Sequence, residues 1–312
     1  MLPTQKGAVR LFRFSGIQVY LHWSWFVVAL IEFNVRDAQY SAPFWNVAEY
    51  LALFVIVLLH EFGHALACRQ TGGQADTIIL WPLGGVAYVA PPPRPGATLW
   101  SIAAGPLVNV ILLPLAFGLA LTADGIGWDT TLPNLRHFLW TLVYINGGLL
   151  VFNLLPVYPL DGGQILRSLL WFVVGPARSL IIATIVGLVG AATLAGIAIY
   201  AGSVWFGVIA VFMAVNCWRS LQHARLLRNL EKAPAHSGAR CPACLAPPLI
   251  GPFWACNLCQ TRFDTFVTGA ECPQCHQQFP LTTCIRCGTT RPMSEWLEQP
   301  RPPVIRPANT SQ

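Results

Sequence analysis

Two histidines and a glutamate stand at a spacing that can build a metal site. The sequence reads His60-Glu61-Phe62-Gly63-His64, so the two imidazole side chains are four residues apart. On a helix, residues at this spacing share one face, and both rings can therefore bind the same metal ion. Glu61 follows the first histidine, where a carboxylate can act as a base on a metal-activated water molecule. The motif predicts metal-dependent hydrolytic chemistry.

The motif lies in a strongly apolar chain. Hydrophobic residues make up 54% of the 312 residues and charged residues 10%, whereas soluble domains carry about 25% charged residues. The mean hydropathy of +0.54 agrees with this. Three ionisable side chains at membrane depth each cost about 2.5–3.5 kcal/mol on insertion scales. A mere packing role for two histidines and a glutamate in such a chain is therefore hard to explain.

We predict an all-α polytopic membrane protein with about six transmembrane helices, because a spanning helix needs about 20 mainly apolar residues. The expected spans are residues 17–33, 48–68, 98–121, 138–155, 180–201 and 203–218. Basic residues gather at alternate ends of these spans, which accounts for the net charge of +6. The positive-inside rule then places both termini in the cytosol. We expect a multi-pass protein of the bacterial inner membrane.

A small membrane-embedded β-hairpin is expected between the second and third spans. Residues 76–93 carry β-branched residues on both sides of a Gly-Gly pair and end in three prolines. An open strand edge is costly in lipid, so protein must shield this hairpin or it must line a wet cavity. Its edge either pairs with an extended substrate segment or only shapes the cavity, and the sequence leaves both readings open. The candidate substrate-binding residues are Val86, Ala87, Tyr88 and Val89.

Asp161 is the best candidate for a third metal ligand. A catalytic zinc ion usually has three protein ligands, and the histidines supply only two. Asp161 follows Pro156 and Pro159 at the exit of the fourth span and precedes two glycines. Prolines break a helix and glycines allow a tight turn, so we expect Asp161 on non-helical backbone. The alternative is an ordinary Asp-Gly turn at the membrane surface.

Together these motifs resemble the site-2 protease family of intramembrane zinc metalloproteases. The likeness covers roughly residues 16–219. It rests on the His-Glu-x-x-His motif, on the Gly-Gly hairpin, and on two further segments. These are Gly105-Pro106-Leu-Val-Asn109 and Asn153-x-x-Pro156-x-x-Pro159-Leu160-Asp161-Gly162.

The resemblance implies a role for each residue of the site. His60, His64 and Asp161 would bind one catalytic zinc ion, and Glu61 would be the general base for zinc-activated water. Asn153 would donate a hydrogen bond to the oxyanion or to the substrate backbone, although it could equally cap the backbone that Pro156 breaks. The substrate class would be transmembrane or membrane-proximal protein segments. We expect Asn109 to be a helix-contact residue.

Eight of the ten cysteines form a separate pattern of four Cys-x-x-Cys pairs. Such strict pairing is typical of tetrahedral zinc sites rather than disulfides, and it indicates a reducing compartment. Chain order predicts a double zinc ribbon with two structural zinc ions, for a total of three Zn²⁺ per chain. The first predicted set is Cys241, Cys244, Cys256 and Cys259, and the second is Cys272, Cys275, Cys284 and Cys287.

The domain boundaries follow from these features. We expect a cytosolic N-terminal segment (1–16), an intramembrane metalloprotease domain (17–218), a basic helix and linker (219–240), the double zinc ribbon (241–290) and a disordered tail (291–312). The ribbon is expected to bind a protein partner or to regulate the enzyme. Nucleic acid is not favoured, because residues 232–312 hold seven basic and four acidic residues without a dense basic stripe.

Two other readings of the whole chain remain. One is a membrane-anchored zincin with a cytosol-facing catalytic domain, which would need a glutamate ligand on a later helix. The sequence offers no such site. The other is a catalytically inactive membrane scaffold whose zinc ribbons recruit a protein or nucleic-acid partner. Presence of every catalytic residue type favours the active protease.

Overall fold

The computed structural model describes residues 7–27, 40–81 and 84–296, and the chain divides into two compact units. We call Met1–Leu226 the membrane unit and Leu227–Gln312 the cysteine module. In the membrane unit the elements are β1 (Ala8–Phe14), β2 (Ile17–His22), α2 (Pro43–Gln70), β3 (Gln74–Trp81), β4 (Gly84–Ala90), α3 (Pro95–Gly125), α4 (Trp128–Thr131), α5 (Pro133–Leu154), α6 (Asp161–Val174) and α7 (Pro176–Tyr200); α8 (Val204–Lys232) continues into the cysteine module.

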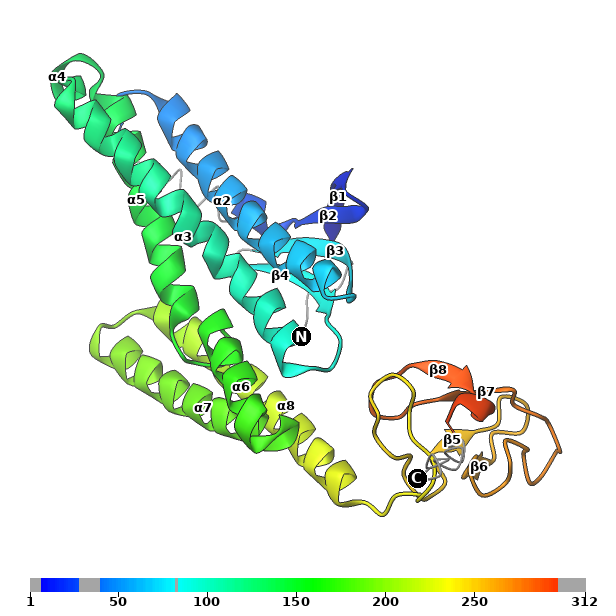
Figure 1. The fold of residues 1–312 in the computed structure, drawn as a ribbon. Coiled ribbons are helices and arrows are strands. Elements are labelled where there is room, and N and C mark those ends of the chain that lie inside the picture. The colour runs from blue at the N-terminus through cyan, green and yellow to red at the C-terminus, as the bar shows by residue number, and fades with distance from the viewer. Residues whose placement is uncertain (1–6, 28–39, 82–83, 297–312) are drawn as a thin grey trace, which may run out of the picture. The chain divides into compact units, whose positions relative to one another are not determined.

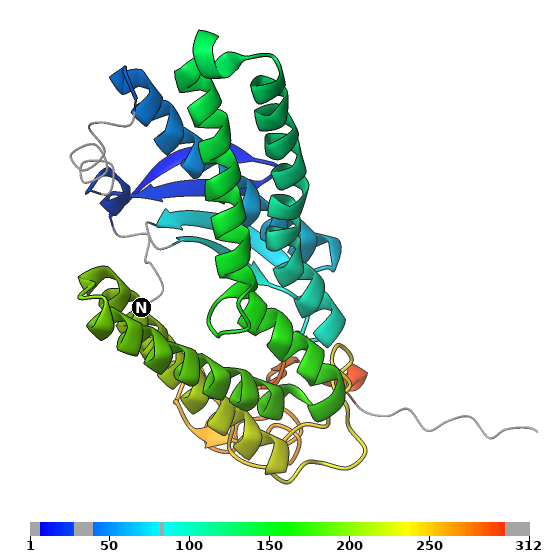
Figure 2. The ribbon, with the colours of Figure 1, turned by 90° about the vertical axis from the view of Figure 1, so that its left-hand side faces the viewer.

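Among the described residues, five helices, α2, α3, α5, α7 and α8, are long and apolar enough to cross a membrane. Four of them begin with a proline in the first turn, where the missing N–H has no helical partner in any case. Helices α2, α3 and α5 run side by side, and α7 and α8 lie next to each other (Figures 1 and 2). The prediction of a polytopic helical membrane protein is confirmed, and these helices contain the second to sixth predicted spans.

The first predicted span, residues 17–33, is wrong in its first part. Ile17–His22 is strand β2, residues 24–27 are helical, and residues 28–33 lie outside the described residues. The side chains of β2 alternate, with Ile17 and Val19 fully buried and Gln18 and Tyr20 less so. That two-residue period is the mark of a strand, and it disappears when hydropathy is averaged over a helix-length window.

The strands form one four-stranded sheet in the order β1-β2-β3-β4. Strands β1 and β2 are antiparallel, β2 and β3 are parallel, and β3 and β4 are antiparallel. One face packs on α2, where Ile17, Ile78 and Leu80 share a buried cluster with Val57 and Phe62. The strands cross the direction of the neighbouring helices (Figure 2). The predicted hairpin is therefore β3–β4, but it belongs to a larger sheet, with β4 at one edge.

Helix α6 was not predicted, and the expectation of Asp161 on non-helical backbone is wrong. Asp161 is the first residue of α6, and Gly162 and Gly163 are helical and buried. A Cβ atom at Gly162 would lie 2.3 Å from the carbonyl oxygen of Leu154, and one at Gly163 would lie 2.3 Å from the amide of Tyr158. The glycine pair thus permits a helix to pack on the preceding loop rather than a turn.

The cysteine module is built from four turns with one backbone conformation. Its strands are β5 (Trp254–Ala255), β6 (Arg262–Phe263), β7 (Leu281–Thr283) and β8 (Thr290–Pro292), followed by the 3₁₀ turn Met293–Glu295. In each Cys-x-x-Cys turn, the amide of the following residue donates to the carbonyl of the first cysteine at 2.8–3.0 Å. That following residue has a positive φ each time: Leu245 (59°), Gln260 (59°), His276 (59°) and Gly288 (73°).

The module extends past the boundary predicted at residue 290. Trp296 is 1% exposed and packs with Cys241 and Cys284, so the chain is ordered at least to this residue. Residues 297–312 lie outside the described part. At the other end, His236 of the predicted linker contacts the Asp264 carboxylate at 2.9 Å. Burial would raise the pKa of Asp264, but its hydrogen bonds with the Gly251 amide and His236 outweigh burial and lower it.

We predict that Leu245→Gly stabilises the module and Gly288→Ala destabilises it, each by about 1 kcal/mol, because a side chain disfavours the left-handed backbone region. Leu245 is 67% exposed and a Cβ at Gly288 would meet nothing within 4 Å, so packing changes little in either variant. Zinc release in rising guanidinium, followed with a chromophoric chelator, measures both. Shifts of equal sign would contradict the prediction.

Candidate metal centres and active site

Helix α2 brings His60, Glu61 and His64 to one buried face. All three residues are 5–6% exposed, and their ligand atoms lie within 4.8 Å of one another. The Nε2 atoms of the two histidines are 3.0 Å apart. The four-residue spacing has therefore placed both imidazoles against a common point, as predicted.

Asp161 completes this group from the start of α6. Its Oδ2 atom lies 3.0 Å from Nε2 of His60 and 3.3 Å from Nε2 of His64. Around a tetrahedral zinc ion with bonds of about 2.0–2.1 Å, neighbouring ligand atoms are about 3.3 Å apart. The three donors thus fit one zinc ion, although α6 rather than a turn positions the carboxylate.

Two polar contacts orient the histidine rings. Nδ1 of His60 lies 2.6 Å from Oδ1 of Asn109, and Nδ1 of His64 lies 2.9 Å from the carbonyl oxygen of Ser101. Each acceptor requires a proton on Nδ1, so each Nε2 presents its lone pair to the common point. Both acceptors lie on α3, which therefore sets the tautomer of both histidines.

Sequence reasoning undervalued Asn109 and did not single out Asn146. Both side chains are buried, at 0% and 1% exposure. The Asn109 side-chain amide donates to Oδ1 of Asn146 at 2.6 Å, and Asn146 donates back to the Asn109 carbonyl at 2.9 Å. Because the Asn109 oxygen must accept from His60, each amide has one allowed orientation. A buried asparagine in each of two apolar helices is the signal that could have revealed the pair.

Glycines allow the helices and the sheet to approach this group. A Cβ at Gly105 on α3 would lie 2.2 Å from Nε2 of His64. One at Gly63 would lie 2.6 Å from the Ala104 carbonyl oxygen. One at Gly85 on β4 would lie 2.2 Å from Cγ of Glu61. Each contact is shorter than real Cβ contacts, so a side chain at any of these positions would force a neighbouring group to shift.

A cavity of about 580 Å³ opens next to the histidines, Glu61 and Asp161. Asn153 lines it, as do Ala87 and Val89 from the predicted hairpin edge. Tyr88 is 36% exposed and is not among the lining residues, and the side chain of Val86 lies outside the described part. Helix α8 also contributes to the lining, with Trp205, Ile209, Phe212, Met213, Asn216 and Ser220. The walls of the cavity are mainly apolar with a few polar groups, as in ligand-binding cavities.

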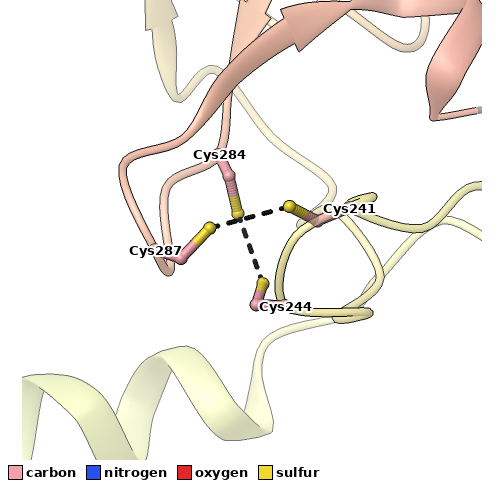
Figure 3. Close-up of side chains that lie close together, drawn as sticks. All are labelled: Cys241, Cys244, Cys284 and Cys287. Carbon is pink, nitrogen blue, oxygen red and sulfur yellow. Dashed lines mark hydrogen bonds between the residues drawn. The ribbon is translucent and has the colours of Figure 1, made fainter. Parts of the chain in front are cut away.

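The eight cysteines form two sets of four, but the predicted pairing is wrong. The first and last pairs combine into one set, Cys241, Cys244, Cys284 and Cys287 (Figure 3). The two middle pairs combine into the other, Cys256, Cys259, Cys272 and Cys275. The second set is thus nested inside the chain segment that the first set closes.

Distances within both sets fit zinc. The Sγ atoms of Cys241 and Cys287 are 3.6 Å apart, and those of Cys244 and Cys284 are 3.8 Å apart (Figure 3). In the nested set two such distances are 3.5 Å. Sulfur ligands about 2.3 Å from a tetrahedral zinc ion are about 3.8 Å apart. Four thiolates without an open position are typical of a structural site.

The fold and this group of side chains define a polytopic membrane protein with a buried histidine–histidine–aspartate group that could hold a metal ion. Comparison with known proteins identifies the class further: the profile of Peptidase family M50 matches residues 48–127 and 126–197. The membrane unit is thus similar to the site-2 proteases of Peptidase family M50, and the resemblance seen in the motifs is confirmed.

Individual relatives agree with this assignment. The chain is 36% identical to a zinc metalloprotease of Methanocaldococcus jannaschii over 182 residues, which are 58% of this chain and 50% of that protein. It is 33% identical to stage IV sporulation protein FB of Bacillus subtilis over 118 residues, 37% of this chain and 38% of that protein. This chain therefore spans about half the length, or less, of these two curated relatives.

A solved structure is also similar. The site-2 protease of Methanocaldococcus jannaschii matches with a TM-score of 0.50 and 27% identity, covering 69% of this chain and 95% of that one.

We predict that Asn109→Leu weakens zinc binding at the histidine site by about 10–100-fold, the usual cost of losing a partner that orients a ligand. His60 would lose its Nδ1 acceptor inside an apolar helix bundle. Competition with a graded series of chelators measures the affinity. Thr122→Leu, a similar change at an exposed position of α3, is the control. Equal affinity in the Asn109 and Thr122 variants would refute an orienting role for Asn109.

Proposed function

We propose that this protein is an intramembrane zinc metalloendopeptidase that cleaves transmembrane or membrane-proximal protein segments, in the manner of regulated intramembrane proteolysis. The observation that carries this proposal is the meeting of His60, His64 and Asp161 beside Glu61 and a cavity, among helices apolar enough to span a membrane. Similarity to zinc metalloproteases supports the same activity.

Each residue of the site has a defined part in the chemistry. His60, His64 and Asp161 would hold the zinc ion, which when bound polarises a water molecule and lowers its pKa to about 7. Glu61 accepts the proton of the attacking water and later delivers it to the leaving amine. Asn153 lines the same cavity, from which it can donate a hydrogen bond to the oxyanion or to the substrate backbone.

Substrate must reach the site in extended form, because the amides of a helix are shielded by their own hydrogen bonds. Strand β4 is an edge strand that borders the cavity, and it can add an extended segment by backbone pairing. Amides alternate between the two edges of a strand. The Ala87 amide points away from β3, towards Glu61, so the backbone amide of residue 86 faces β3 and those of residues 85, 87 and 89 face outward. We therefore assign substrate pairing to the outward amides of β4 that Glu61 does not occupy.

The cysteine module would hold two structural zinc ions and offer a surface to a protein partner. We infer a multi-pass protein of the bacterial inner membrane with both termini in the cytosol. Support comes from Arg69 in the last turn of α2 and Arg94 just before α3, which both flank the β3–β4 hairpin. The positive-inside rule places such basic residues at the cytosolic ends of membrane helices. The four cysteine pairs are then in a reducing compartment, as zinc thiolates require.

We predict that Glu61→Gln lowers the rate of cleavage by about 10²–10⁴-fold, the usual contribution of a general acid–base group, while zinc stays bound. The assay uses the full chain in proteoliposomes, with a spanning substrate that carries Gly and Asn in its cytosolic third. Asp129→Asn, at an exposed position far along the chain, makes the same chemical change as a control. Failure of the wild-type protein to cleave any of a panel of such substrates would favour the inactive scaffold.

We predict three zinc ions per full-length chain, one at the histidine site and two at the cysteine sets. Paired substitutions then test the nested arrangement. Cys256→Ser with Cys272→Ser removes ligands from one set and should leave two zinc ions, whereas Cys241→Ser with Cys256→Ser should leave one. Inductively coupled plasma mass spectrometry of purified protein gives the count. The reverse pattern would restore the pairing in chain order.

A further inference from the structure

The carboxylate of Glu61 is attached to the edge of the sheet. Its Oε2 atom accepts a hydrogen bond from the Ala87 amide at 2.8 Å. Glu61 is 5% exposed, and its carboxylate ligand oxygen lies within 4.8 Å of the ligand nitrogen atoms of His60 and His64. The side chain thus reaches from the metal-binding face of α2 to the outward edge of β4.

A second observation shows that the strand is shaped for this side chain. A Cβ atom at Gly85 would lie 2.2 Å from Cγ, 2.5 Å from Cδ and 2.5 Å from Oε1 of Glu61. The carboxylate therefore lies over Gly85, and any other residue there would displace it. Gly85, which has no side chain, and the hydrogen bond from the Ala87 amide together define one position for the Glu61 carboxylate.

We propose that the Ala87 amide is a positioning group for Glu61, so that the hairpin edge is divided between catalysis and substrate binding. This inference rests on the proposed protease function. The amide holds Oε2, and Oε1 stays free to accept the proton of the attacking water. Because its amide is already used, Ala87 cannot donate to a substrate strand. The next outward amide, that of Val89, is the one that pairs with substrate.

The separate roles of the Ala87 and Val89 amides have different kinetic consequences. A long carboxylate side chain in a cavity can adopt several rotamers, and only some of them place an oxygen next to the reacting water. The amide at Ala87 selects one of these before substrate arrives. Its loss should therefore lower kcat, whereas loss of the Val89 amide should raise KM.

The test removes single amides without changing side chains. Nonsense suppression with lactic acid at position 87, or with α-hydroxyisovaleric acid at position 89, replaces one backbone N–H by an ester oxygen in the full chain. Either ester also turns the preceding carbonyl group, which faces β3, into a weaker hydrogen-bond acceptor. Each variant therefore weakens one hydrogen bond between β3 and β4, so each serves as a control for the other. We expect kcat to fall about 10–100-fold for the ester at 87, with KM and zinc content nearly unchanged. For the ester at 89 we expect a higher KM and a nearly unchanged kcat.

A second variant tests the position of the Glu61 carboxylate with all backbone amides intact. Gly85→Ala should lower kcat as the ester at 87 does, because the added Cβ displaces the carboxylate. Gly148→Ala on α5, where a Cβ would meet nothing within 4 Å, should keep the wild-type kcat. Wild-type kinetics for Gly85→Ala would overturn the inference.

Hydrogen exchange supplies a readout that does not depend on activity. In Glu61→Ala the Ala87 amide loses its acceptor and should exchange at least about 10-fold faster, while the Val89 amide should keep its rate. Residue-resolved mass spectrometry of the hairpin peptide measures both.

The two proposals fail in different ways. An unchanged Ala87 exchange rate in Glu61→Ala, or a rise in KM alone for the ester at 87, would overturn the positioning role. Neither result would touch the protease activity, which the Glu61→Gln measurement decides.

Discussion

Charge in a hydrocarbon environment is the constraint on which this structure depends. Lipid offers no hydrogen bonds, so each buried ionisable group must find its partners within the protein. Helix α2 carries three such groups at the site, and every one has a neighbour: Asn109 for His60, the Ser101 carbonyl for His64 and the Ala87 amide for Glu61. These partners lie on α3 and β4. The packing of α3 and the sheet against α2 is therefore a requirement of the site as much as of the core.

Close approach by glycine is how the fold meets this requirement. The polar partners are mostly backbone groups, which reach a side chain only if the intervening element has no side chain of its own. Gly105 lets α3 come against His64, Gly85 lets β4 come against Glu61, and Gly162 lets α6 come against the loop after α5 so that Asp161 reaches both histidines. Each of these three elements, α3, β4 and α6, thus has a glycine at a close contact.

Much of this could be predicted from sequence, because the chemistry was local. The four-residue spacing of His60 and His64 depends only on helix geometry, and long apolar runs report spanning helices directly. The misses were non-local. Strand β2 looked like the start of a span because one of its two partner strands, β3, lies more than fifty residues away. Asn109 meets Asn146 only after two helices have packed, and α6 begins at glycines that favour turns in isolation. Propensity and hydropathy carry no information on such contacts.

The combination of the four cysteine pairs into two sets also depends on non-local contacts, and here the energies can be compared. Pairing in chain order would close loops of 11 and 8 residues, whereas the observed sets close loops of 12 and 39 residues. Loop-closure entropy grows only with the logarithm of loop length, so the longer loop costs about 1–1.5 kcal/mol more. Burying one large apolar side chain contributes about 1.5–3 kcal/mol. Trp296 is buried against Cys241, Cys284 and the ring of Phe266, a site that exists only when the outer pairs meet. Burial of this tryptophan thus favours the meeting of the outer pairs, and cysteine spacing alone could not reveal it.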